Sequence, residues 1–259
     1  MSRDARLFTV EVETATGPAR GRMAVQTGPM RLAELVPLAC ELAELQVTRA
    51  SEAEERAGRP VSCRAGCGAC CRQMVPLSPP EVFYLGEVVG RSDPALRERW
   101  RRGFDRIIEA ATESGLRARL TRPDLSVDEG MAIALEWFRM GVPCPFLENE
   151  SCGIHPVRPA VCREYNVTSP AEWCADPVAH EIVRVPVPRS VSEALSRLTR
   201  ELTGTELRLV PLGLAPIWAA SHSELDRRTW DGPELFARFI DLLGGRAPGP
   251  ADSGPAEGG

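Results

Sequence analysis

The sequence predicts a mainly α-helical fold with minor β structure and an N-terminal β-hairpin. Capping signals open several amphipathic stretches along the chain. Alternation with a period of two is clearest at the N-terminus, and no regular succession of strands and helices suggests a doubly wound sheet. The chain has 259 residues, 43% of them hydrophobic and 26% charged, and is therefore long enough to bury a globular core.

Residues 1–29 are expected to form the hairpin as an extension of the main domain. Apolar and polar residues alternate from Phe8 to Val12, as in a half-buried strand. Gly17-Pro18 turns the chain, and Met23 and Val25 supply the returning apolar face.

A long helix is predicted from Pro37 to Arg56, with its proline in the first turn, where the missing N–H costs nothing. A long arginine-rich helix is expected from Asp93 to about Leu120. Other helices are expected to begin at capping boxes, in which Ser or Asp is followed three residues later by Glu. These boxes start at Ser78, Ser126, Ser169, Ser190 and Asp231.

Two short strands are predicted at residues 182–187 and 207–212. The last segment, residues 246–259, consists largely of Pro, Gly and Ala without apolar side chains to bury, and is expected to be a disordered tail. The main domain is therefore expected to span residues 30–245.

Charge and composition exclude several classes of function. The formal net charge of −5 gives no reason to expect a nucleic acid as partner. The chain has no lysine, which is typical of codon use in GC-rich bacterial genomes and excludes Schiff-base chemistry through lysine. No apolar run approaches the roughly 20 residues that span a bilayer, and the N-terminus lacks the apolar core of a signal peptide. A cytoplasmic protein without a membrane partner is predicted.

Cysteine is the informative residue type, because eight of the nine cysteines lie between residues 63 and 174. Reducing cytosol keeps thiols free, so clustered cytosolic cysteines usually bind metal or perform redox chemistry. The prediction is thus a compact helical domain around a cysteine-ligated metal site. Cys40 is remote from this cluster, lies on an apolar helix stripe and is interpreted as a core residue.

The first knot, Cys63-Arg-Ala-Gly-Cys67-Gly-Ala-Cys70-Cys71, contains glycines that disfavour a regular helix and let nearby thiolates converge. Tetrahedral zinc needs its sulfur ligands at about 2.3 Å. Adjacent Cys70 and Cys71 cannot easily both face one such ion, which indicates a cluster or two sites.

The second knot comprises Cys144, Cys152, Cys162 and Cys174. Cys174 lies near the start of the helix expected at Ser169, where a helix N-terminus would lower its thiol pKa and favour the thiolate. Each knot holds enough cysteines for one four-thiolate site. The knots could form two sites, or they could interleave.

Several side chains near the cysteines could contact a cofactor. Arg158 and Arg163 could offset the net charge of −2 that four thiolates leave around Zn²⁺ or a [4Fe–4S]²⁺ core, as could Arg64 and Arg72. Tyr165 could line a pocket over the cluster. His155 could be a nitrogen ligand or a bystander beside the site.

The dense first knot, and the proline that follows Cys144, favour an iron–sulfur cluster over zinc, although soft thiolates accept either metal. Cys63, Cys67 and Cys70 also have the spacing of radical enzymes. Those enzymes build a (β/α) barrel, which this sequence does not offer.

Taken together, the first knot and three further motifs resemble the YkgJ-type cysteine-cluster family, which carries the zinc- or iron-chelating CxxCxxCC domain. The further motifs are Val75-Pro-Leu-Ser-Pro-Pro-Glu81, Cys144-Pro-Phe-Leu147 and Cys152-Gly-Ile-His-Pro-Val-Arg-Pro-Ala-Val-Cys-Arg-Glu-Tyr165. The resemblance covers roughly residues 60 to 175, and the chain has three residues between its first two cysteines where the family pattern has two. It implies binding of metal or an Fe–S cluster by Cys63, Cys67, Cys70, Cys71, Cys144, Cys152 and Cys162.

The family includes a flagellin lysine N-methylase that uses S-adenosylmethionine. Such an enzyme, acting on a protein substrate, is therefore an alternative to a metal-cluster protein, and a metal-handling or redox-sensing protein is a second alternative. The sequence shows no Gly-x-Gly-x-Gly after a clear strand, which weakens the methylase interpretation.

Overall fold

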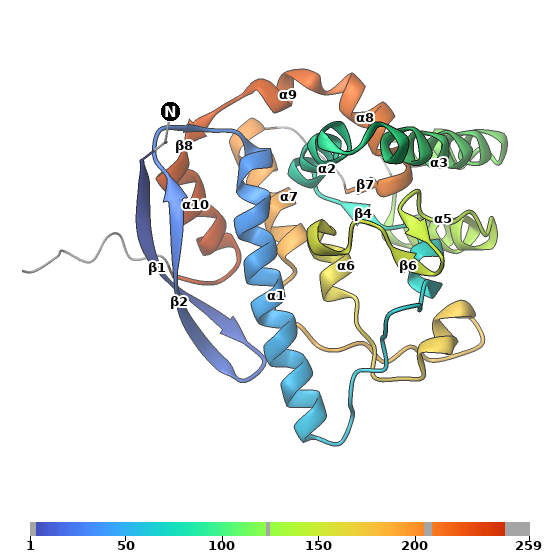
Figure 1. The fold of residues 1–259 in the computed structure, drawn as a ribbon, viewed down its shortest axis with the longest axis horizontal. Coiled ribbons are helices and arrows are strands. Elements are labelled where there is room, and N and C mark those ends of the chain that lie inside the picture. The colour runs from blue at the N-terminus through green and yellow to red at the C-terminus, as the bar shows by residue number, and fades with distance from the viewer. Residues whose placement is uncertain (1–3, 123–124, 205–208, 247–259) are drawn as a thin grey trace, which may run out of the picture.

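The computed structural model describes residues 4–122, 125–204 and 209–246, and helices dominate it (Figure 1). The predicted mainly helical class with minor β structure and an N-terminal hairpin is confirmed. The α-helices are α1 (Leu32–Arg56), α2 (Pro79–Arg91), α3 (Pro94–Glu113), α4 (Leu116–Leu120), α5 (Val127–Arg139), α6 (Ala160–Glu164), α7 (Val191–Thr203), α8 (Ala215–Ser221), α9 (Ser223–Arg227) and α10 (Gly232–Leu242). Short 3-10 helices are η1 (Ala69–Arg72), η2 (His155–Val157), η3 (Ala171–Ala175) and η4 (Leu212–Leu214).

All the strands of the described residues pair in antiparallel twos. The long hairpin consists of β1 (Ala5–Thr14) and β2 (Gly17–Gln26), and three short pairs link distant parts of the chain or close a tight turn. These are β3 (Pro29–Met30) with β8 (Trp230–Asp231), β4 (Pro76–Leu77) with β7 (Val210–Pro211), and β5 (Leu147–Glu148) with β6 (Ser151–Cys152).

The hairpin has the predicted inner face. Phe8 lies opposite Met23, and the alternating residues Phe8, Val10 and Val12 are buried. Gly17 turns the chain with a φ of 99°, which favours glycine. The inner face packs into one core with α1, α7 and α10 (Figure 1). In space the hairpin therefore shares a core with these helices. The domain boundary expected after residue 29 stays a prediction.

Helix α1 begins at Leu32, so the start predicted at Pro37 is wrong. The cap lies upstream, where the backbone N–H of Arg31 donates to Glu34 Oε2 at 2.7 Å. Pro37 lies inside the helix, within its first two turns. In Figure 1 this helix stands between the hairpin with α10 on one side and α2 with α6 on the other.

Two other helix predictions need correction. The helix expected from Asp93 to Leu120 is divided into α3 and α4, because Gly115 takes a φ of 73° that ends the first helix. The capping box at Ser169 does not form, and only the 3-10 turn η3 follows it. The Ser169 hydroxyl instead accepts a hydrogen bond from the backbone of Val183 at 3.2 Å.

The strand predicted at residues 182–187 is also wrong. One isolated bridge joins Arg184 to Val167, and the prolines at positions 186 and 188 remove the backbone donors that a longer ladder would need. Of the strand predicted at residues 207–212, Val210–Pro211 forms β7, while residues 207–208 lie outside the described residues. Within the predicted tail, Arg246 bonds to the backbone of Glu11, and residues 247–259 lie outside the described residues.

The capping box at Ser78 starts α2, and its glutamate, Glu81, also bonds to two other helices. The Glu81 side chain is 1% exposed, and its Oε2 accepts hydrogen bonds from the backbone N–H and the hydroxyl of Ser78 at 2.9 and 2.7 Å. The same oxygen accepts from the hydroxyl of Ser192 at 2.6 Å, and Oε1 accepts from the backbone N–H of Ala160 at 2.8 Å. One carboxyl group thereby ties α2 to the first turns of both α6 and α7.

A second buried carboxyl group strengthens the same junction. Glu164, at the end of α6, accepts hydrogen bonds from the backbone N–H of Val191 at 2.6 Å and the hydroxyl of Ser190 at 3.0 Å. Burial raises the pKa of Glu164 to about 7. The start of α7 is therefore satisfied by side chains from two other helices.

Among the described residues, none of the helices combines the length and the hydrophobicity needed to cross a membrane.

We expect Glu81→Ala to lower the free energy of unfolding by about 3 kcal/mol, because buried donors on α6 and α7 lose their acceptor. Glu129→Ala is the matched control. It removes the corresponding glutamate of the exposed capping box at Ser126, where water can replace the lost bonds, and should cost about 1 kcal/mol or less. Urea denaturation of the two variants measures the difference, and equal losses would contradict the role given to Glu81.

Candidate metal centre

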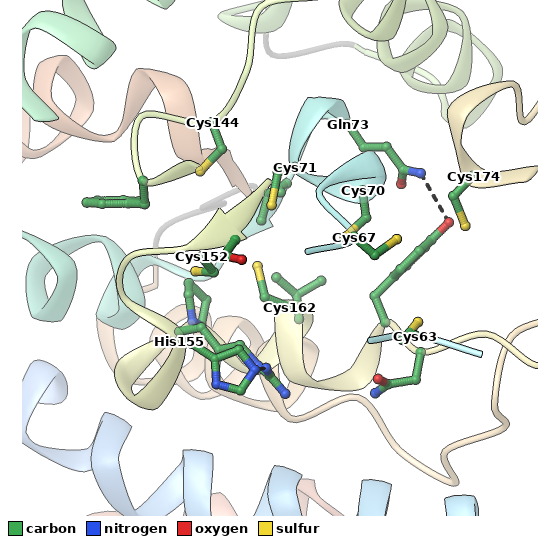
Figure 2. Close-up of a pocket in the computed structure, with 18 of the residues that line it drawn as sticks. Cys63, Cys67, Cys70, Cys71, Gln73, Cys144, Cys152, His155, Cys162 and Cys174 are labelled. Atoms are coloured by element: carbon green, nitrogen blue, oxygen red, sulfur yellow. Dashed lines mark hydrogen bonds between the residues drawn. The ribbon is translucent and has the colours of Figure 1, made fainter. Parts of the chain in front are cut away.

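One cavity of about 620 Å³ is lined by cysteines from both knots. Figure 2 shows their sulfur atoms around a common space, with chain segments from several short elements behind them. The sequence left open whether the knots form separate sites or interleave, and here they face the same cavity. The lining cysteines are Cys63, Cys67, Cys70, Cys71, Cys144, Cys152, Cys162 and Cys174.

The first knot reaches the cavity through a tight loop followed by η1, as its glycines predict. Gly66 has a φ of 83°, a conformation that side chains rarely adopt. Gly68 allows a close approach, because a Cβ atom there would lie 2.5 Å from Glu150 Oε2 and 2.8 Å from Leu147 Cδ1. The first knot is therefore packed directly against the β5–β6 turn of the second.

The second knot is carried by separate short elements. Cys144 precedes β5, Cys152 lies in β6, Cys162 in α6 and Cys174 in η3. The turn of the β5–β6 hairpin places Asn149 and Glu150 at φ values of 49° and 57°. Two consecutive left-handed residues are typical of a type I′ turn, although the second is usually glycine.

Two contacts hold the two knots together around the cavity. The backbone N–H of Cys144 donates to the carbonyl of Cys71 at 2.7 Å. Arg72 forms a bidentate ion pair with Glu150, at 2.7 and 3.0 Å, and also donates to the carbonyl of Gly68 at 2.9 Å. The second position of such a turn is usually glycine, and here it is Glu150. The ion pair with Arg72 holds Glu150 in this left-handed conformation and so stabilises the turn.

Burial sets the protonation of the thiols. Burial raises the pKa of Cys144 to about 12, and it also raises that of Cys162 well above its ordinary value. Burial and the neighbouring thiols also raise the pKa of Cys174 to about 11, so the prediction that a helix N-terminus lowers it is wrong. Cys174 lies near the end of a 3-10 turn instead. These thiols are protonated at neutral pH. A metal that binds them as thiolates must therefore displace their protons.

Two arginines, Arg64 and Arg158, lie in the cavity wall, and Arg158 has the contacts that matter to the thiols. Its guanidinium contacts His155, which also lines the cavity, and its Nε atom is buried without a hydrogen-bond partner among the described residues. Burial raises the pKa of Cys63 and of Cys152, and the charge of Arg158 partly opposes that rise in both. A thiolate or a cluster sulfur could accept a hydrogen bond from this buried Nε–H group.

Arg163 is predicted to contact a cofactor, but its guanidinium makes other contacts. Its guanidinium donates to the carbonyls of Pro156 at 2.6 Å and Arg158 at 3.0 Å, and pairs with Glu44 of α1 at 2.9 Å. It is absent from the described residues that line the cavity. Its contacts fix the backbone that carries Arg158.

Tyr165 does line the cavity, as its prediction requires. Its hydroxyl accepts a hydrogen bond from the Gln73 amide at 3.1 Å and also interacts with the thiol of Cys174. Gln73 was not singled out in the sequence, where a glutamine two residues after the last cysteine of the first knot carries no distinctive signal. The same is true of the apolar wall, formed by Met74, Val75, Phe146, Ile154, Val161 and Leu212.

Cys40 occupies the place predicted for it in the core. It is 8% exposed on α1 and packs in the cluster formed by α1, α7, α10 and the hairpin. Burial raises its pKa to about 11, and its thiol donates to the carbonyl of Arg158 at 3.9 Å. It is absent from the cavity lining.

The donor set fits zinc or iron, because soft thiolates select both. The arrangement is nevertheless wider than a single-ion site. Among the described residues, no group of three or more His, Cys, Asp or Glu side chains is arranged to hold one metal ion. The thiols instead surround a volume that a single ion would not fill.

Residues 62–179 match the model of a protein family, the CxxCxxCC domain, described as "Putative zinc- or iron-chelating domain". This segment is therefore similar to the CxxCxxCC domain. The resemblance inferred from the motifs is therefore confirmed over these residues. The matched range contains both knots of the CxxCxxCC domain and ends before α7. No curated protein and no solved structure matches the chain.

Substitution separates cavity thiols from the core thiol. We expect Cys70→Ala or Cys162→Ala to reduce metal content sharply, because each removes a soft donor from the cavity. Cys40→Ala should leave metal content unchanged and reduce stability only through lost packing. Elemental analysis of the purified variants checks this, and loss of metal in Cys40→Ala would refute the assignment.

Metal removal should loosen the two knots selectively. The knots consist of turns and short elements, whereas α7 is buried in the helical core. We expect a chelator to increase amide hydrogen exchange in residues 63–74 and 144–174 while exchange in residues 191–202 stays slow. Unchanged exchange in both knots after verified loss of metal would contradict metal-dependent folding.

Proposed function

We propose that the chain is a cytoplasmic iron–sulfur protein whose CxxCxxCC domain binds a cluster, [4Fe–4S] in type, through the cavity cysteines. The observation that carries the proposal is the convergence of eight thiols from both knots on a single cavity. Buried thiols that merely pack as small hydrophobes have no reason to gather around an open volume.

The width of the site favours a cluster over a zinc ion. Tetrahedral zinc holds its sulfur ligands at about 2.3 Å and would draw four of them to one point. The described side chains are not arranged around such a point, whereas a cavity of about 620 Å³ has room for several metal and sulfide atoms. Zinc is the alternative that the same donors would accept.

The residues beside the thiols suit a negatively charged centre. Four thiolates around a [4Fe–4S]²⁺ core carry a net charge of −2, which is costly to bury without a counter-charge. Arg158 places a cation on the cavity wall, with a buried donor free to reach sulfur. We assign Arg158 and Tyr165 to the cofactor and Arg163 to positioning of the Arg158 backbone.

The apolar side of the cavity limits the access of water. Phe146 and Ile154 are fully or nearly fully buried, and Leu212 closes the wall from a distant part of the chain. Exclusion of solvent protects thiolate ligands and tunes the potential of a bound cluster. The chain itself thus supplies ligands, counter-charge and a dry surrounding.

Anaerobic purification tests the proposal. We expect brown protein with broad visible absorbance, iron, and acid-labile sulfide, because sulfide is released only by an iron–sulfur cluster. The control is the same preparation from cells supplied with ample zinc and iron together. Colourless protein with stoichiometric zinc and no sulfide would decide for a zinc centre.

A further inference from the structure

The eight cavity thiols fall into two groups of four. In Figure 2 the sulfur atoms on one side belong to Cys63, Cys67, Cys70 and Cys174. Those on the other side belong to Cys71, Cys144, Cys152 and Cys162. The groups do not follow the order of the sequence, because each takes three cysteines from one knot and the fourth from the other.

The electrostatics of the first group agree with this placement. Burial raises the pKa of Cys174, and the thiols that add to the rise are Cys63, Cys70 and Cys67. Burial also raises the pKa of Cys63, with further contributions from Cys70 and Cys67. Cys174 is therefore a neighbour of the first knot although about a hundred residues separate them along the chain.

In the second group the electrostatics relate Cys144, Cys152 and Cys162 to one another, and Cys70 of the first group contributes as well. Burial raises the pKa of Cys162, and Cys144, Cys70 and Cys152 add to the rise. Cys71 joins this group through its backbone, whose carbonyl accepts from Cys144 at 2.7 Å.

Adjacent Cys70 and Cys71 lie at the junction of the two groups. A hydrogen bond with Cys71 and burial raise the pKa of Cys70. Cys70 in turn adds to the rise in the pKa of Cys144, which belongs to the second group. Consecutive side chains in the 3-10 turn η1 leave the backbone in different directions, so the pair can serve two centres more easily than one.

We propose that the cavity holds two neighbouring metal centres, one on Cys63, Cys67, Cys70 and Cys174 and the other on Cys71, Cys144, Cys152 and Cys162. The inference rests on the proposed function, because it specifies how many centres the same cavity holds. The arrangement follows the logic of two-cluster ferredoxins, in which a run of three cysteines takes its fourth ligand from the other run.

Arg158 is placed to serve both centres. Its charge partly opposes the burial-driven rise in pKa of Cys63, from the first group, and of Cys152, from the second. A cation shared between two negative centres reduces their mutual repulsion as well as the cost of burying each.

Paired substitutions test the number of metal centres. Cys63→Ser and Cys152→Ser each remove one ligand from a different group, at positions that are exposed and half-buried, so little packing is lost. We expect the full-length chain, isolated anaerobically, to lose half of its wild-type metal in each variant and nearly all of it in the double variant. Cys40→Ser is the matched control and should retain the wild-type content.

The outcomes separate this inference from the proposed function. Complete loss of metal in either single variant, or wild-type content in one of them, would overturn the two centres while leaving a single cluster standing. Half-loss of zinc from a sulfide-free protein would retain two centres and overturn the iron–sulfur assignment. A wild-type chain that binds no metal would overturn both.

A second measurement does not depend on the folding of variants. Two reduced clusters in one cavity interact magnetically, so the electron paramagnetic resonance spectrum of the reduced wild-type protein should show spin coupling. A fully reduced protein with the uncoupled spectrum of one isolated cluster would refute the inference.

Discussion

A buried carboxyl group joins the cysteine-bearing part of the molecule to its helical core. Glu81 is almost fully buried and accepts hydrogen bonds from α2, α6 and α7 at once. Because α6 carries Cys162 and follows the turn that carries Arg158, the position of the cavity wall depends on this group. A polar network in a core is stable only when all its members are satisfied, so this junction tolerates few substitutions.

The cavity itself is held by contacts that make little use of regular structure. Gly68 brings the first knot against Glu150, and Arg72 fixes that glutamate in a left-handed conformation. Short loops and 3-10 turns supply no long ladders of hydrogen bonds to keep thiols in place. The stiffness of the ligand set must therefore come from these cross-links and from a bound metal.

The sequence was a good guide where the determining interaction is local. Capping at Ser126 and the glycine-bearing turn at Gly66 follow from neighbouring residues, and both were predicted. Prediction failed where a distant partner decides the outcome. The hydroxyl of Ser169 bonds to Val183 rather than capping a helix, and Gln73 lines the cavity, where its amide donates to Tyr165. Likewise, cysteine spacing located the site but could not show that both knots line one cavity.

The bond between Cys71 and Cys144 also closes a long excursion of the chain, residues 72–143, which contains α2 to α5. The entropy cost of closing such a loop rises only with the logarithm of its length, and each doubling costs about 0.6 kcal/mol. The excursion is not independent of the site, because Trp100 and Phe104 of α3 pack edge-on against Phe146 in the cavity wall. Insertions would therefore cost least farther along the segment, where α4 and α5 pack on the second half of α3 and away from the thiols.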